Sequence, residues 1–177
     1  VKAHPQHFHR EHGPTTMAKA DMFLKLEGKK TGVVKGEANA PDHPEEIEVF
    51  DWSWGMTGPQ GLGGAGATSR VALSEIRISK WTDRATTSLM SVMRSNELIK
   101  GAVLSVRKSG VSPPIDYLVI SIANGRITSH TIGTATPGKP ELVETLSIAF
   151  EEIEVKYAEQ RSTGSKSAEQ TFSARVV

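Results

Sequence analysis

Apolar and polar residues alternate in short runs along most of the chain, and this period of two is typical of β-strands. The runs occupy residues 22–27, 46–55, 70–81, 99–108, 115–122, 126–133, 142–157 and 171–176. Two of the runs change parity, which predicts a β-bulge or sharp bend at Ser74–Glu75 and at Glu151–Glu152. Val, Ile and Thr together number 40 against 10 Leu, a composition that also favours strands.

Residues 82–96 depart from this alternation. Their apolar side chains recur at helical spacing, at Ala85, Leu89, Val92 and Met93. Thr82 or Asp83 can cap the start of a helix, because a side-chain oxygen accepts a backbone N–H there. Asn96 tolerates the left-handed conformation in which many helices end.

About eight strands with one helix after the third predict a mainly β fold. The expected architecture is a compact β-barrel of about eight strands, or a two-sheet sandwich, with one α-helix at about 82–96 on its side. The length of 177 residues suggests one domain, at 17–177. Residues 1–16 are polar and aperiodic, so we expect a disordered leader or a cloning remnant there, with Met17 as the natural first residue.

Composition and charge exclude several classes of protein. The chain has 21 basic and 20 acidic residues, and this balance argues against a nucleic acid as the main partner. It has no cysteine, which excludes a disulfide scaffold, a thiolate zinc site and a cysteine nucleophile. No apolar run approaches about 18 residues and no basic start precedes an apolar stretch, so we expect neither membrane insertion nor a cleaved signal peptide.

The candidate chemical motifs are weak. Residues 61–66 match G-x-G-x-x-G, but a strand pattern follows where a dinucleotide site needs a helix. His43, His130 and the carboxylates at 151–154 fit structural or surface positions, and four histidines in residues 1–16 leave a metal-binding tract as an alternative. No acid, base and nucleophile converge, so the sequence predicts a protein that is not an enzyme and holds no cofactor or metal.

A ligand-binding hypothesis rests on Trp52 and Trp54, which share one face of the run 46–55. Aromatic faces can stack on sugars or bases, although the pattern favours packing in a core or interface. With the glycine-rich loop 55–69 beside them, a small-ligand-binding or hydrolytic β-barrel is the second hypothesis. A ligand would then raise the thermal stability, whereas the stability of a self-assembling protein would depend on its own concentration.

Taken in order, several stretches resemble the haemolysin-coregulated protein family, the tube-forming component of type VI secretion systems. The most specific is E-E-I-E-V-F-D-W-S-W-G-M at 45–56, with its acidic–aliphatic–tryptophan pattern. The others are M-A-K-A-D-M-F-L-K-L-E-G (17–28), G-G-A-G (63–66), D-R-A-T-T-S-L (83–89), R-K-S-G (107–110), I-D-Y-L-V-I (115–120) and L-V-E-T-L-S-I-A-F (142–150). The resemblance therefore covers residues 17 to about 176.

This resemblance implies a non-enzymatic subunit that closes into rings of six copies, with the rings stacked into a hollow tube. The implied partners are further copies of the chain, a contractile sheath, a tip spike protein and effector proteins. The tube would assemble in the bacterial cytoplasm and then be secreted without a cleaved signal peptide.

The resemblance also places the contacts. The loops 28–45 and 55–69 are long enough to reach the next ring, and long loops in compact domains are commonly functional. The contact candidates in them are Lys30, Val34, Gly55, Pro59, Leu62 and Gly64. In the family the helix lines the lumen, and the polar side chains expected there are Thr86, Thr87, Ser91 and Arg94.

Overall fold

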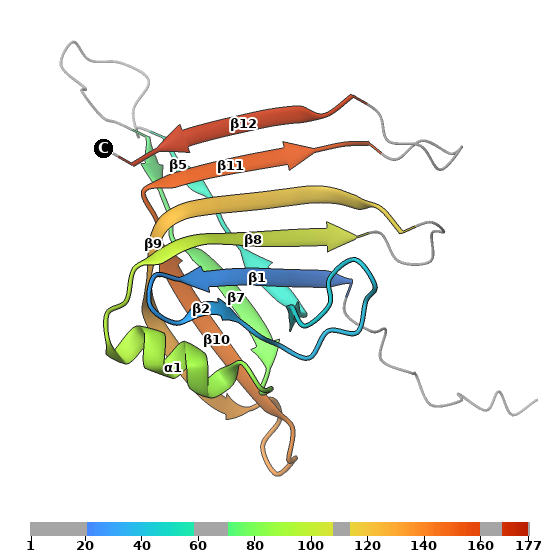
Figure 1. Ribbon diagram of the computed structural model, residues 1–177, viewed down its shortest axis with the longest axis vertical. Helices are drawn as coiled ribbons and strands as arrows, with labels where there is room; N and C mark the ends of the chain where they lie inside the picture. The colour runs from blue at the N-terminus through green and yellow to red at the C-terminus, as the bar shows by residue number, and fades with distance from the viewer. Residues whose placement is uncertain (1–20, 59–70, 108–113, 160–167, 177) are drawn as a thin grey trace, which may run out of the picture.

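The computed structural model describes residues 21–58, 71–107, 114–159 and 168–176. Two twisted β-sheets share the long strand β9 and enclose the core, and the helix α1 lies against their lower end (Figure 1). In chain order the elements are β1 (Met22–Gly28), β2 (Gly32–Val34), β3 (Ile47–Val49), β4 (Asp51–Ser53), β5 (Met56–Thr57), β6 (Ala72–Leu73), β7 (Ile76–Trp81), α1 (Thr86–Arg94), β8 (Ile99–Arg107), β9 (Asp116–Thr134), β10 (Leu142–Ala149), β11 (Glu152–Tyr157) and β12 (Gln170–Arg175).

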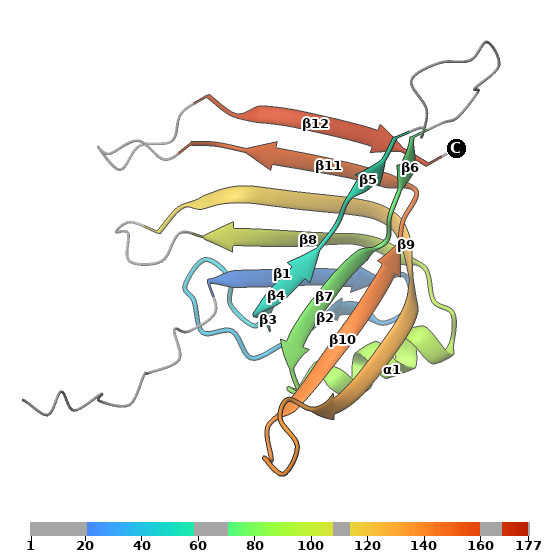
Figure 2. The ribbon, with the colours of Figure 1, turned by 180° about the vertical axis from the view of Figure 1, so that it is seen from behind.

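The pairing of the strands is antiparallel throughout. One sheet contains β1, β8, the first half of β9, β11 and β12, with β2 and β3 both paired to β1. The other contains the second half of β9, then β10, β7 and β4. The short strands β5 and β6 pair with each other and form the stem of the loop that joins them. Figure 2 shows this stem beside β12.

Strand β9 corrects the expectation of two separate strands at 115–122 and 126–133. It is one strand of 19 residues that bends from the first sheet into the second. The bend falls at Asn124, whose φ is 53°, and at Gly125, where a Cβ would stand 2.8 Å from the carbonyl oxygen of Ala149. The Asn-Gly pair therefore redirects the strand, because asparagine adopts positive φ readily and glycine permits the close approach of β10.

The two predicted changes of parity mark real breaks. At Ser74–Glu75 the chain leaves β6 and enters β7. At Glu151 it leaves β10 in one sheet and enters β11 in the other, where the Glu151 N–H donates to the Ala123 carbonyl oxygen at 3.2 Å. The second break is thus a crossover between sheets rather than a bulge within one strand, and this is why the apolar side switches there.

The run 46–55 also divides, because it serves both sheets. Strand β3 pairs with β1, strand β4 pairs with β7, and the Phe50 N–H between them donates to the Ser79 carbonyl oxygen at 3.1 Å. This segment joins the two sheets at the side opposite β9. The sheets do not form one closed cylinder of paired strands, so the fold is a barrel only in a loose sense.

The helix is shorter than expected, at Thr86–Arg94, because a turn occupies residues 84–85. Asp83 stands at its start: its carboxylate accepts the Ala85 N–H at 2.9 Å, and its own N–H donates to the Thr86 hydroxyl at 3.0 Å. These two bonds hold the turn that leads into α1, whose N-cap residue is Ala85. Asn96 follows the helix with a φ of 48°, as the sequence predicts.

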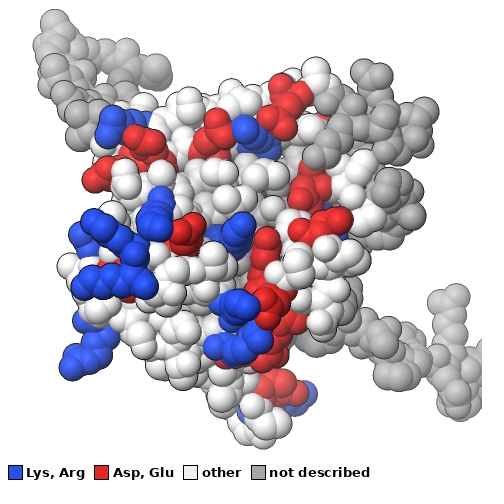
Figure 3. All heavy atoms as spheres, in the orientation of Figure 1, with Lys and Arg blue, Asp and Glu red and all other residues white. Residues whose placement is uncertain are grey.

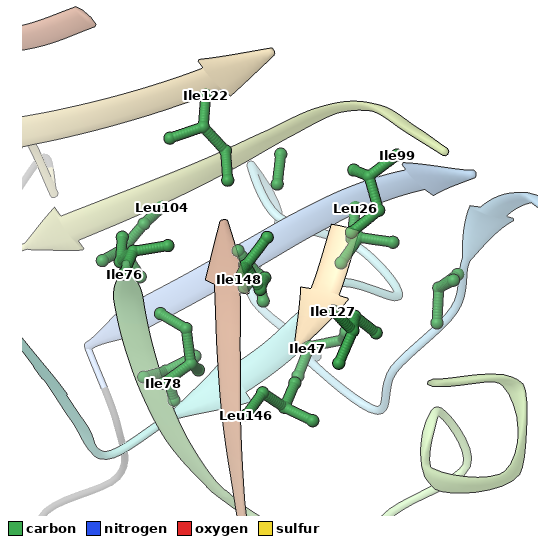
Figure 4. Close-up of a cluster of buried hydrophobic side chains, with 14 of the residues drawn as sticks. Leu26, Ile47, Ile76, Ile78, Ile99, Leu104, Ile122, Ile127, Leu146 and Ile148 are labelled. Atoms are coloured by element: carbon green, nitrogen blue, oxygen red, sulfur yellow. The ribbon is translucent and has the colours of Figure 1, made fainter. Parts of the chain in front are cut away.

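The core lies between the two sheets and is closed at one end by α1. It is built from the inward-facing positions of both sheets, and Figure 4 shows side chains of Leu26, Ile47, Ile78, Leu104, Leu146 and Ile148 meeting there. Leu89 and Val92 on the buried face of α1 complete it. Burial of these aliphatic side chains is the main stabilisation, at roughly 25 cal/mol per Å² of apolar surface.

Candidate assembly surfaces

Trp52 and Trp54 are both partly buried and pack against the core. The Trp54 ring also faces Phe172 of β12, with the ring centroids 6.3 Å apart. Packing therefore accounts for both rings, and they do not form a free platform on which a ligand could stack. Within the described residues, no group of three or more His, Asp or Glu side chains has the arrangement of a metal site.

A buried charge network, formed by Lys80, Asp83, Thr86, His130 and Glu144, fixes α1 to the second sheet. The Lys80 ammonium lies 2.7 Å from the Asp83 carboxylate and 3.3 Å from that of Glu144. The Thr86 hydroxyl donates to Glu144, and His130 Nε2 lies 3.1 Å from the same carboxylate. Lys80 and Glu144 are fully buried, so neither charge has water as an alternative partner.

Burial alone would raise the pKa of the Glu144 carboxyl. The hydrogen bonds from Thr86 and His130 and the charge of Lys80 outweigh that effect and hold the pKa below its ordinary value. Sequence reasoning missed this network. The signal was present, since Lys80 and Glu144 both occupy inward positions in runs whose other inward residues, Ile78 and Leu146, are apolar.

Thr86 corrects the expected lumen-facing set. It is buried, and it faces the network because it lies on the same side of α1 as Leu89 and Val92. Thr87, Ser91 and Arg94 are exposed on the opposite side of the helix. Met90, 41% exposed, interrupts this polar face.

Val34 corrects the expected loop contacts. It is 2% exposed and pairs with Leu26, so its side chain belongs to the core, whereas the neighbouring Val33 is exposed. Gly55 lies at the base of the β5–β6 stem, where its N–H donates to the Ser74 hydroxyl at 2.9 Å. Pro59, Leu62 and Gly64 lie outside the described residues, as do residues 1–16.

Lys30 is exposed on the β1–β2 turn, and Glu97 holds the backbone of that turn. The carboxylate of Glu97 accepts the Thr31 N–H at 2.7 Å, the Thr31 hydroxyl at 2.8 Å and the Lys30 N–H at 2.5 Å. These bonds, the one from the Thr31 N–H first, hold the pKa of the Glu97 carboxyl below its ordinary value. The turn is thereby fixed to the segment that follows α1, so it presents Lys29 and Lys30 in a defined position.

The segment after β2 is fixed at the other end of β1 by His43. Its ring stacks on Phe23 at a centroid distance of 4.6 Å. One ring nitrogen lies 2.8 Å from the Glu46 carboxylate and the other 3.1 Å from that of Asp116. Arg107 continues the cluster, with its Nε 2.8 Å from Asp116. His43 is thus a structural residue.

Strand β12 is an edge strand. It pairs with β11 on one side, and no described strand pairs with its other side. Phe172 on β12 is 40% exposed and Tyr157 on β11 is 45% exposed. An unpaired edge next to exposed aromatic rings is a surface that proteins usually cover.

Residues 23–157 match the family model described as "Type VI secretion system effector, Hcp". The chain is also 33% identical over 148 residues to protein hcp1 of Pseudomonas aeruginosa PAO1, an alignment that covers 82% of this chain and 88% of the relative. The chain belongs to the Hcp family of the type VI secretion system. The family resemblance inferred from the sequence is therefore confirmed.

Solved Hcp structures share the fold. A structure described as a type six secretion system protein has a TM-score of 0.77 and 22% identity, covering 89% of this chain and 96% of that one. Hcp1 from Salmonella typhimurium has a TM-score of 0.67 and 23% identity, covering 88% and 95%. Membership makes this chain a protein of the type VI secretion system. No helix among its described residues is long and apolar enough to cross a membrane.

Proposed function

We propose that this Hcp protein is a structural, non-enzymatic subunit of the type VI inner tube. Six copies close into a ring, the rings stack into a tube, and the tube carries effector proteins. The other partners are the contractile sheath and the tip spike protein. Assembly takes place in the bacterial cytoplasm and is followed by secretion.

The unpaired edge of β12 is the observation that carries this proposal. No strand among the described residues pairs with its outer side, and the rings of Phe172 and Tyr157 lie exposed nearby. A neighbouring copy that contacts this edge with a different surface forms a heterologous contact, and such contacts repeat until the ring closes. Covering the edge removes a site at which chains would otherwise aggregate.

The exposed side of α1 is proposed to face the channel. Thr87 and Ser91 are uncharged and Arg94 is the only charged member of the set, so the wall would be hydrophilic with little charge. Apart from the exposed Met90, such a wall offers passing cargo few apolar or strongly charged contacts. The loop joining β5 and β6, with the Gly55–Ser74 bonds at its base, is proposed to reach the next ring.

The ring is tested by measuring particle mass and by negative-stain electron microscopy of the purified chain. We expect the wild type to form hexamers with a central hole. We expect Phe172→Glu to remain monomeric, because it places a charge in the contact. Val33→Glu, at a comparably exposed valine on β2, is the matched control and should leave hexamers intact. Monomeric wild type, or hexamers that persist in Phe172→Glu, would refute the proposed ring contact.

The channel assignment has its own test, because the chain contains no cysteine. In Ser91→Cys, a small maleimide should label both rings and monomers, whereas a bulky polymer-linked maleimide should label rings much more slowly. Lys139→Cys, in the exposed turn before β10, should react equally fast with both reagents. Equal rates at Ser91→Cys would place α1 outside the channel.

A further inference from the structure

A group of basic side chains lies at the left of Figure 3, level with the end of β1 and the end of α1. Four exposed residues, Lys29, Lys30, Arg94 and Arg126, form this basic corner. Two bonds tie the corner to the segment after α1: the Lys29 backbone N–H donates to the Leu98 carbonyl oxygen, and the Arg126 guanidinium donates to that of Asn96. Their positions are therefore set by the fold.

The basic corner is offset only in part within its own subunit. The buried carboxylate of Glu97 accepts bonds from the backbone of the β1–β2 turn, and the charge of Lys30 helps to lower its pKa, so one negative charge faces four positive ones. The ion pairs of the described residues involve none of the four side chains of the corner. The nearby Lys100 differs, because it pairs with Glu27 at 2.7 Å. The corner thus presents a local positive charge on a chain whose net charge is only +1.

Negatively charged side chains lie at the other end of β1, where they form a band right of centre in Figure 3. Residues 37–46, the acidic segment, contain Glu37, Asp42, Glu45 and Glu46 and no Lys or Arg. Ion pairs with Lys35, Arg84 and Arg107 offset part of this charge, yet the Asp42 side chain stays 64% exposed.

Strand β1 separates the two charged surfaces. The basic corner follows its last residue, Gly28, while His43 of the acidic segment stacks on Phe23 near its start. Seven residues of strand span roughly 23 Å. This exceeds the Debye length of about 8 Å at physiological salt, so the corner cannot be compensated by the acidic segment of its own chain.

We propose that the basic corner of one subunit docks on the acidic segment of a second copy in the next ring, so that stacking is head-to-tail and set by charge. This inference rests on the proposed ring. The partner follows from complementarity, since the same chain carries the matching charge at its far end. Such a contact orients the rings, because two basic corners or two acidic segments facing each other repel.

Disulfide trapping tests the contact directly. In Lys30→Cys/Asp42→Cys the two thiols of one chain lie at opposite ends of β1, so they cannot bridge within a subunit. Mild oxidation should give covalent species larger than one ring. Lys139→Cys/Asp42→Cys is the matched control and should give none. Absence of such species in the first variant, or equal amounts in the control, would overturn the docking.

Charge inversion supplies a second, independent result. Lys29→Glu/Lys30→Glu should lower the fraction of stacked rings about tenfold while rings still form, because like charges then oppose each other. Adding Glu37→Lys/Asp42→Lys to the same chain should restore stacking. Wild-type stacking should also weaken as salt is raised from 0.05 to 0.5 M. Stacking that neither set of substitutions changes would refute a charged contact. A wild-type protein that forms no rings would refute the proposed function instead.

Discussion

Removing the ammonium of Lys80 should destabilise this protein more than any surface charge change. In Lys80→Met the fully buried Glu144 carboxylate keeps its bonds from Thr86 and His130 but loses the buried ammonium of Lys80. Leaving one partner of a buried ion pair uncompensated costs about 3–5 kcal/mol. At roughly 2–4 °C per kcal/mol for a chain of this size, the thermal midpoint should fall by about 6–20 °C.

The assay is thermal unfolding followed by circular dichroism under conditions that keep the chain monomeric. Lys100→Met is the matched control, since Lys100 forms an exposed ion pair with Glu27, and its midpoint should hardly move. The double variant Lys80→Met/Glu144→Gln should recover part of the loss, because the buried charge of Glu144 is then gone while the Asp83 carboxylate still lacks its Lys80 partner. A midpoint for Lys80→Met no lower than that of Lys100→Met would refute the reasoning.

Three further outcomes are expected. The pKa of the Glu144 carboxyl is lower in the folded protein than its unfolded value of about 4.3, so its contribution to stability is present above that value and is lost as pH falls through the folded pKa. The thermal unfolding midpoint should therefore drop less steeply between pH 7 and pH 3 in Glu144→Gln than in the wild type. Gly36→Ala should lower the free energy of unfolding by about 1–3 kcal/mol, because a Cβ there would collide with the backbone carbonyl of Glu46; denaturant titration measures it. Deleting residues 58–66 should leave the monomer's midpoint unchanged, since the β5–β6 stem pairs only with itself among the described strands, and should abolish stacked tubes seen by electron microscopy.

The predictions separate stability from assembly. Lys80 and Gly36 act inside one subunit, so their variants should unfold more easily without any change in which surfaces meet. The loop beyond β5 and the charges at the two ends of β1 act between subunits, and their variants should stay folded.

The sequence alone was sufficient for the elements whose signals are local. The period of two located the strands, and helical spacing located α1 to within a few residues. Asp83 and Asn96 marked the ends of the helix because capping and positive φ depend on only a few neighbouring residues. The tryptophan pattern at 45–56 and the stretches around it were specific enough to identify the family.

Only the tertiary structure shows which distant strands lie side by side, and this decides which side chains face inward and which groups they contact. Alternation cannot say whether Val33 or Val34 faces inward, so the sequence predicts Val34 as a contact residue. Its pairing with Leu26 shows that its side chain lies in the core. Thr86 is polar and lies on the buried side of α1 with Leu89 and Val92, and only the tertiary structure shows that Glu144, 58 residues away, is the buried partner of its hydroxyl. The charged ends of β1 likewise become visible only when α1, β9 and the segment after β2 are brought beside it, because non-local packing gathers charges that the sequence leaves scattered.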